Sequence, residues 1–213
     1  MVRDSECWKQ IEAAFSKLKD SELWEVRQDD FLFGKKGDYS DWDMDLESAH
    51  GKWHDHVWAY KAAADNLVSV ILCGPGWLRD YIDVYPVLAL YRHYVEIALK
   101  ELIVSAAVFN DVSVPKLETH VLTNLWARAV SMVKGGEGDD PGIEWELIGE
   151  YVAKVDAIPY DLGRYPWTRE KADVQLPNKY INLIQLQLFM TRLGSELEAI
   201  TNWLRDLEQY RYE

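Results

Sequence analysis

The chain has 213 residues, 48% of them hydrophobic, with 10 Trp, 12 Tyr and 5 Phe; this excludes a disordered chain and fits one domain over residues 1–213. Its 36 acidic and 23 basic residues give a net charge of −13, which excludes bulk binding to duplex DNA or an anionic membrane. No window reaches the roughly 18 apolar residues of a membrane helix and no apolar signal region opens the chain, so we expect a cytoplasmic protein without a membrane partner.

The N-terminal part, residues 1–51, is expected to hold one helix and an irregular insertion. Apolar residues recur at three- and four-residue intervals from Ser5 to Leu18 and predict the helix. Asp29 to Gly51 has no clear period, and seven acidic residues fall between Gln28 and Glu47. This stretch is typical of a solvated loop.

Residues 52–208 are expected to form the bundle core. Apolar spacing and the Gly and Pro positions predict five helices here: Trp53–Leu72, Pro86–Phe109, one from Thr119 to about Val130, Ile143–Val155 and Asn178–Leu207. The Gly-rich segment Gly135–Gly142 reads as a linker within one bundle, since neither flank is large enough for a separate domain. The sequence therefore predicts an all-α bundle of about six helices with an irregular N-terminal insertion.

The helix from Pro86 carries the sharpest polar pattern. Arg92, Glu96 and Lys100 lie four residues apart, and His93 borders them, so we expect a polar stripe on one helical face. One interpretation is a site for an anion or phosphodiester, in which Arg92 offers a bidentate fork and His93 a proton donor or acceptor. The other is an ordinary salt-bridge ladder with a structural role, and spacing alone favours the ladder.

Two further segments could complete a site. His120 follows a loop and could face the stripe as a second acid or base; the alternative is a local hydrogen bond at a helix start. Arg164 and Tyr165 lie in the connector from Pro159 to Pro177, where a loop residue can serve a site.

No metal or cofactor site is predicted. His54 and His56 are only two residues apart, a spacing that splays them across a helix, and Gly51 disrupts the first pairing, that of His50. Cys7 and Cys73 lack the paired spacing of a zinc or redox motif. Gly135-Gly-Glu-Gly is not followed by the Lys and Ser or Thr of a phosphate loop.

Three ordered blocks resemble a group of bacterial and phage-associated helical proteins related to the HEPN superfamily. They are Tyr85-Pro-x5-Arg92-His93-x2-Glu96-x3-Lys100, then His120-x-Leu-x2-Leu-Trp126, then Asp156 leading into Gly163-Arg-Tyr-Pro166. The resemblance spans about residues 55 to 205. It implies a helical bundle that is often dimeric, with members that cut RNA without metal and others that act as antitoxin partners, nucleotide-binding modules or phage-defence components.

Active members of that superfamily use an arginine followed, after four to six residues, by a histidine, and none of the five histidines here follows an arginine at that spacing.

We therefore carry two hypotheses. In the first, a HEPN-like domain binds RNA, a nucleotide or a protein at Arg92, His93, Glu96, Lys100, His120, Arg164 and Tyr165, in phage defence or a toxin–antitoxin pair. If it is an enzyme, it is a metal-independent endoribonuclease in which His93 or His120 deprotonates a ribose hydroxyl and Arg92 stabilises the phosphorane. In the second, the stripe is structural and the chain is a non-catalytic protein-interaction module.

Overall fold

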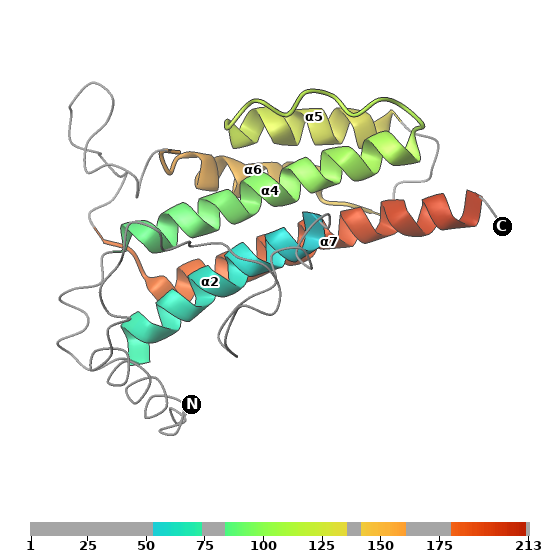
Figure 1. Ribbon diagram of the computed structural model, residues 1–213. Helices are drawn as coiled ribbons and strands as arrows, with labels where there is room; N and C mark the ends of the chain where they lie inside the picture. The colour runs from blue at the N-terminus through green and yellow to red at the C-terminus, as the bar shows by residue number, and fades with distance from the viewer. Residues whose placement is uncertain (1–52, 74–83, 136–141, 161–179, 212–213) are drawn as a thin grey trace, which may run out of the picture. The chain divides into compact units, whose positions relative to one another are not determined.

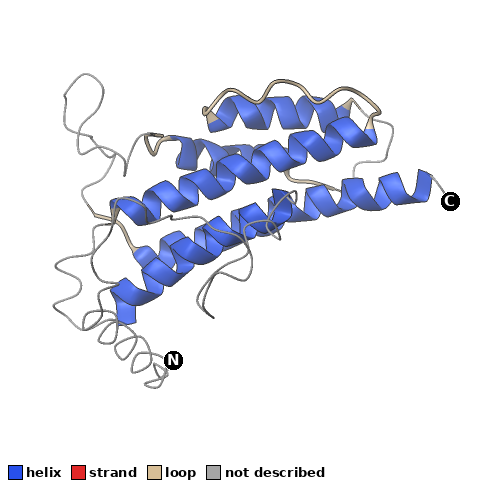
Figure 2. Cartoon of the chain, viewed as in Figure 1, coloured by secondary structure: helices blue, strands red, loops and turns tan. Residues whose placement is uncertain are grey.

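The computed structural model describes residues 53–73, 84–135, 142–160 and 180–211 (Figure 1), all within the compact unit Ala49–Glu213. Five α-helices and no strand occur in this part of the chain (Figure 2): α2 (Trp53–Cys73), α4 (Tyr85–Phe109), α5 (Leu122–Lys134), α6 (Trp145–Asp156) and α7 (Leu183–Arg211). The all-α class is confirmed for the described residues. The HEPN-like arrangement, and a single domain over residues 1–213, stay predictions.

Helix α4 is the centre of the arrangement and contacts each of the other four described helices (Figure 1). It opens with Pro86 in its first turn, where the missing N–H has no helical partner to lose. Fifteen of its 25 residues are buried, among them Arg92, Glu96 and Glu101. Because buried charged side chains are costly unless they are paired, each of these three residues must have partners, either on α4 itself or on a neighbouring element.

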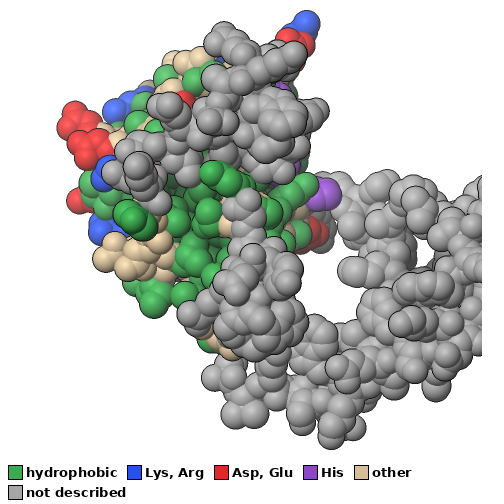
Figure 3. Space-filling view, turned by 90° about the vertical axis from the view of Figure 1, so that its left-hand side faces the viewer, with side chains coloured by type: hydrophobic (Ala, Val, Ile, Leu, Met, Phe, Trp, Pro, Cys, Tyr) green, Lys and Arg blue, Asp and Glu red, His purple; other side chains and the backbone are tan. Residues whose placement is uncertain are grey.

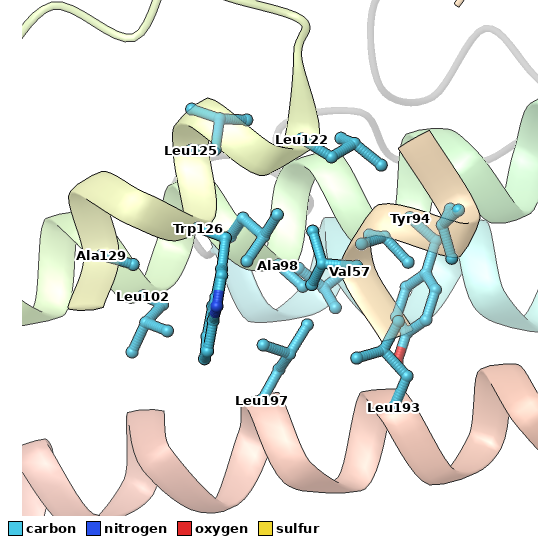
Figure 4. Close-up of a cluster of buried hydrophobic side chains, with 14 of the residues drawn as sticks. Val57, Tyr94, Ala98, Leu102, Leu122, Leu125, Trp126, Ala129, Leu193 and Leu197 are labelled. Carbon is cyan, nitrogen blue, oxygen red and sulfur yellow. The ribbon is translucent and has the colours of Figure 1, made fainter. Parts of the chain in front are cut away.

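The hydrophobic core lies between α4 and its neighbours. Figure 4 shows part of this cluster: Ala98 and Leu102 come from α4, Leu122, Leu125, Trp126 and Ala129 from α5, and Leu193 and Leu197 from α7, and Trp126, Leu193 and Leu197 lie in the space between α5 and α7. On α5 and α7 the buried residues recur at three- and four-residue intervals, so each helix buries one face.

Close packing of α4 on α7 depends on a glycine. A Cβ added at Gly194 would lie 1.7 Å from the hydroxyl oxygen of Tyr94. Tyr94 is only 4% exposed, and its ring points toward α7 (Figure 4). Burial, with smaller contributions from the Glu198 and Asp65 carboxylates, raises the pKa of the Tyr94 hydroxyl. The hydroxyl therefore stays a neutral part of the core.

The described helices overlap the predicted ones, but α5 ends at Lys134 rather than near Val130, and α7 ends at Arg211 rather than near Leu207. The starts of these two helices also differ. The shorter helix begins at Leu122 rather than at Thr119, whose hydroxyl accepts a hydrogen bond from the Val121 N–H outside the helix. Helix α7 begins at Leu183 rather than at Asn178, because the side chain of Asn182 accepts the N–H groups of Ile184 and Gln185 and caps the helix there. The predicted helix at Ser5–Leu18 and the irregular segment Asp29–Gly51 lie outside the described residues.

No helix in the described ranges combines the length and the apolar character needed to cross a membrane. A cytoplasmic location stays a prediction.

Candidate functional site

Five residues form a polar cluster where α4, the start of α5 and the end of α6 meet. We call it the Arg92 cluster, and its members are Arg92, Glu96, Lys100, His120 and Asp156. Three of these, Arg92, Glu96 and Lys100, belong to the predicted stripe of four, and His120 joins them across the fold. The placement of His93 on the same stripe was wrong, since its ring packs against Tyr60. Asp156 was not predicted as a site residue.

Arg92 is buried, with its side chain only 7% exposed, and its guanidinium joins three segments. Its Nε donates to the carbonyl of Ile158 at 2.7 Å, and one terminal nitrogen donates to the carbonyl of His120 at 2.7 Å. The same nitrogen donates to Asp156 Oδ1 at 3.1 Å, and the other lies 3.7 Å from Glu96. The guanidinium is therefore committed to acceptors of the protein itself.

Asp156 caps helix α5 from outside. Its two carboxylate oxygens accept the N–H groups of Leu122 at 3.0 Å and Thr123 at 3.1 Å, and the Thr123 hydroxyl donates to Oδ2 at 2.8 Å. A carboxylate at this end also complements the positive pole of the helix dipole. Burial acts to raise the pKa of Asp156, but these hydrogen bonds and the charge of Arg92 outweigh it and hold the pKa below its usual value.

Glu96 is buried and contacts the two outer members of the cluster, Lys100 and His120. Its Oε1 lies 2.7 Å from Lys100 Nζ and 2.9 Å from His120 Nδ1. Burial acts to raise the pKa of Glu96, but the hydrogen bonds and charges of Lys100 and His120 lower it overall. An ionised carboxylate can only accept, so His120 Nδ1 carries the proton, and in the neutral ring Nε2 is the free acceptor.

The outer edge of the cluster is His120. Its side chain is 58% exposed, and its ring stacks on Tyr160 with the planes 11° apart and the centroids 5.9 Å apart. Of the cluster, this edge alone is open enough to meet a ligand, because Arg92 and Glu96 are buried and Lys100 is only 14% exposed.

His93 lies on a different face of α4. Its ring packs edge-on against Tyr60 of α2, with the centroids 4.4 Å apart, whereas Glu96 contacts both Lys100 and His120. Neighbouring helical residues point about 100° apart, so adjacency in sequence to Arg92 does not bring His93 to the same partners. Arg164 and Tyr165 lie outside the described residues.

A second polar group lies where α4 meets α2 and α7. We call it the Glu101 group: His54, Trp58, Glu101 and Arg205. Arg205 donates to Glu101, Trp58 donates to His54 Nε2 at 3.0 Å, and His54 Nδ1 lies 4.0 Å from Glu101. It borders a cavity of only about 20 Å³, which is the space of one water molecule.

Sequence reasoning missed this second group because Arg205 and Glu101 are 104 residues apart, and no local spacing relates them. Asp156 did carry a signal, since it opens the third block of the HEPN resemblance. His54, considered for metal binding, instead contacts Trp58. Within the described residues no three potential metal ligands lie together, and His50 lies outside them, so the absence of a metal site stays a prediction.

In the part of the chain that the structure describes, fold and site together define a helical bundle with a buried, internally paired arginine cluster. Comparison with protein-family models, with curated proteins and with solved structures found no match. The HEPN relationship therefore stays a prediction from the three sequence blocks.

Proposed function

We propose that this chain is a non-catalytic helical module that binds another protein, and that the Arg92 cluster stabilises its frame. The observation that carries the proposal is the commitment of Arg92. An arginine that stabilises a phosphorane must present its donors to the substrate. Here the guanidinium is buried, and it donates hydrogen bonds to Ile158, His120 and Asp156.

The net charge of the Arg92 cluster also supports a structural role rather than anion binding. Arg92 and Lys100 are balanced by Glu96 and Asp156, so the cluster is neutral before His120 is counted. Among the described residues, no buried side-chain nitrogen or oxygen lacks a hydrogen-bond partner. A site built for a phosphate would keep unpaired donors directed at its ligand, and the buried part of this cluster keeps none.

Exposed apolar side chains support the protein-binding half of the proposal. Tyr180, Ile184 and Leu188, at and just before the start of α7, are 92%, 56% and 65% exposed. Figure 3 looks onto the end of the molecule where α2 ends and α4 and α7 begin, and apolar side chains gather there. Apolar surface gathered in one region commonly marks an interaction site.

The absence of catalysis is tested by incubating the purified full chain with cellular RNA, beside Arg92→Lys and His120→Ala variants. We expect no cleavage by any of the three, and a loss of stability on urea unfolding in Arg92→Lys, because lysine cannot bridge three acceptors. Cleavage by the wild type that disappears in a stably folded His120→Ala variant would contradict the proposal.

Binding to a protein partner is tested by crosslinking the full chain in its native cells. One arm uses a protein-reactive reagent, and the other uses ultraviolet light, which crosslinks bound RNA. The proposal expects one defined protein to crosslink in preference to RNA. Crosslinking to RNA alone contradicts it.

A second candidate function is binding of RNA or a nucleotide at His120, in the phage-defence or toxin–antitoxin setting that the HEPN resemblance implies. The exposed, stacked pair of His120 and Tyr160 favours it, because an aromatic platform can receive a base. For this function, Tyr160→Ala should weaken binding of a labelled single-stranded RNA by about fivefold or more. Tyr210→Ala, which removes a 74% exposed tyrosine elsewhere, is the matched control, and equal losses in the two variants would exclude a site at His120.

The homodimer predicted from the same resemblance is tested by sedimentation equilibrium of the full chain. A mass of one chain at micromolar concentration would contradict it.

A further inference from the structure

A cleft of about 420 Å³ lies between the segment that leads into α6 and the outer face of α7. This volume falls within the range of about 300–1,000 Å³ that is usual for ligand sites. None of the Arg92 cluster or the Glu101 group lines it. The described residues that line it are Gly142, Ile143, Glu144, Glu196, Ala199, Ile200 and Trp203.

The cleft has an apolar floor and an acidic rim. Ile200 is only 2% exposed, and the half-buried Ile143 and Trp203 pack against the core beside it. Glu144 is exposed at the entrance to α6, and Glu196 is half-buried on α7. Because residues three and four apart share one side of a helix, Glu196, Ala199 and Trp203 present a continuous wall.

The local order of the chain keeps the two sides apart. The carbonyl of Ile143 accepts the Trp145 N–H at 2.9 Å, and the carbonyl of Glu144 accepts the Ile148 N–H at 3.0 Å. These bonds turn the chain into α6, and residues 142–144 line the cleft together with residues of α7.

The charge of the cleft indicates which kind of ligand it would bind. Among the described residues, the lining holds two carboxylates and no basic side chain, and the whole chain carries −13. A partner that places apolar side chains on Ile200 and Trp203 therefore gains from cations that reach Glu144 and Glu196, and an acidic partner is repelled.

We propose that this cleft binds a basic amphipathic segment of a partner protein, with apolar side chains in the cleft and Lys or Arg side chains at the acidic rim. The inference rests on the protein-binding function proposed above and names the surface and the chemistry of the partner. An amphipathic helix laid in a groove is the recognition mode that fits a cleft running beside a helix.

The test is titration of the full chain with a fluorescein-labelled helical peptide of Leu and Lys, its Leu and Glu counterpart, and a scrambled Leu and Lys peptide that is not amphipathic. We expect saturable binding of the first peptide alone. The double variant Glu144→Gln/Glu196→Gln should weaken it by about threefold to tenfold, in line with two partly exposed ion pairs.

Two further variants separate the cleft from bulk charge. Asp55→Asn/Glu118→Gln removes the same charge from exposed positions on α2 and on the segment before α5, and it should leave the affinity within about twofold. Ala199→Trp fills the cleft from an exposed helical position and should weaken binding by about tenfold or more. Urea unfolding of each variant checks that it is folded.

Equal losses in the two charge pairs, or equal binding of the scrambled peptide, would overturn the inference by showing attraction through bulk charge. Unchanged peptide binding by the Ala199→Trp variant, in which the new side chain fills the cleft, would overturn it as well. Failure of all peptides to bind, together with a defined protein crosslinked in cells, removes the cleft but keeps the proposed function. RNA cleavage that depends on His120 removes the proposed function whatever the peptides do.

Discussion

The Arg92 cluster and the Glu101 group both place a buried carboxylate of α4 beside an arginine and a histidine. Glu96 and Glu101 have side chains that are 5% and 7% exposed. The arginines differ: Arg92 is 7% exposed and joins α4 to the segments beside α5 and α6, whereas Arg205 is 42% exposed and reaches Glu101 from the surface of α7. The two arginines should therefore contribute differently to the free energy of unfolding, because water competes for the exposed Arg205 and is excluded from the buried Arg92.

The largest effect is expected for Arg92→Ala. Removing one member of a buried ion pair commonly costs about 3–5 kcal/mol, and here two carbonyls and Asp156 lose their donor as well. Urea unfolding followed by circular dichroism measures the free energy of unfolding. A cost below about 1 kcal/mol, the range of an exposed pair, would break the distinction between the two regions.

Near the Glu101 group, packing should matter more than charge. Gly194→Ala forces a methyl group onto the Tyr94 hydroxyl, so we expect a loss of about 2–3 kcal/mol from overpacking. The double variant Gly194→Ala/Tyr94→Phe removes the clashing oxygen and should recover part of the loss. No recovery would show that the two residues do not meet as described.

Asp156→Asn tests the cap of α5. The amide oxygen can still accept one N–H, but the charge facing Arg92 and the second acceptor are lost, so we expect about 1–2 kcal/mol of destabilisation. Hydrogen exchange of the amides of Leu122 and Thr123 should rise in this variant. Glu146→Gln, an exposed acid in the first turn of α6, is the control and should change the stability by no more than a few tenths of a kcal/mol.

The pH dependence follows from the lowered pKa values of Glu96 and Asp156. With the folded pKa below the unfolded one, the unfolded chain binds more protons, so the contribution to stability is present above the unfolded pKa and is lost as the pH falls through the folded pKa. Stability should therefore change little from pH 7 to about 5 and then fall, since unfolded carboxyls titrate near pH 4. Urea midpoints over this range should depend less on pH in Glu96→Gln/Asp156→Asn than in the wild type; an equal slope would contradict the assignment.

Arg205→Ala should have the smallest effect, about 1 kcal/mol or less, because its guanidinium is close to half exposed and water replaces it at Glu101. The comparison with Arg92→Ala uses the same unfolding measurement. Costs of equal size in the two variants would show that exposure of the arginine does not set the difference.

Local patterns predicted the helices well where apolar periodicity, Pro86 and the glycine breaks act within a few residues of one another. They predicted for the same reason that Arg92, Glu96 and Lys100 share one face, since these residues lie four apart, but they wrongly added His93, which packs against Tyr60 instead. They misplaced the start of α5, because the acceptor for its first N–H groups is Asp156, more than 30 residues further along the chain. No local rule describes a cap supplied by another helix.

The sequence by itself determined the all-α class of the described residues and the order of their helices, because helix formation depends on residues close together in the chain. Only the tertiary structure decided what the polar stripe does. Arg92 could have faced solvent or a ligand, and the packing of α5 and α6 over α4 buried it against Ile158, His120 and Asp156 instead. The cleft beside Trp203 was decided in the same way, since its two sides come from segments more than 50 residues apart that meet only in the folded chain.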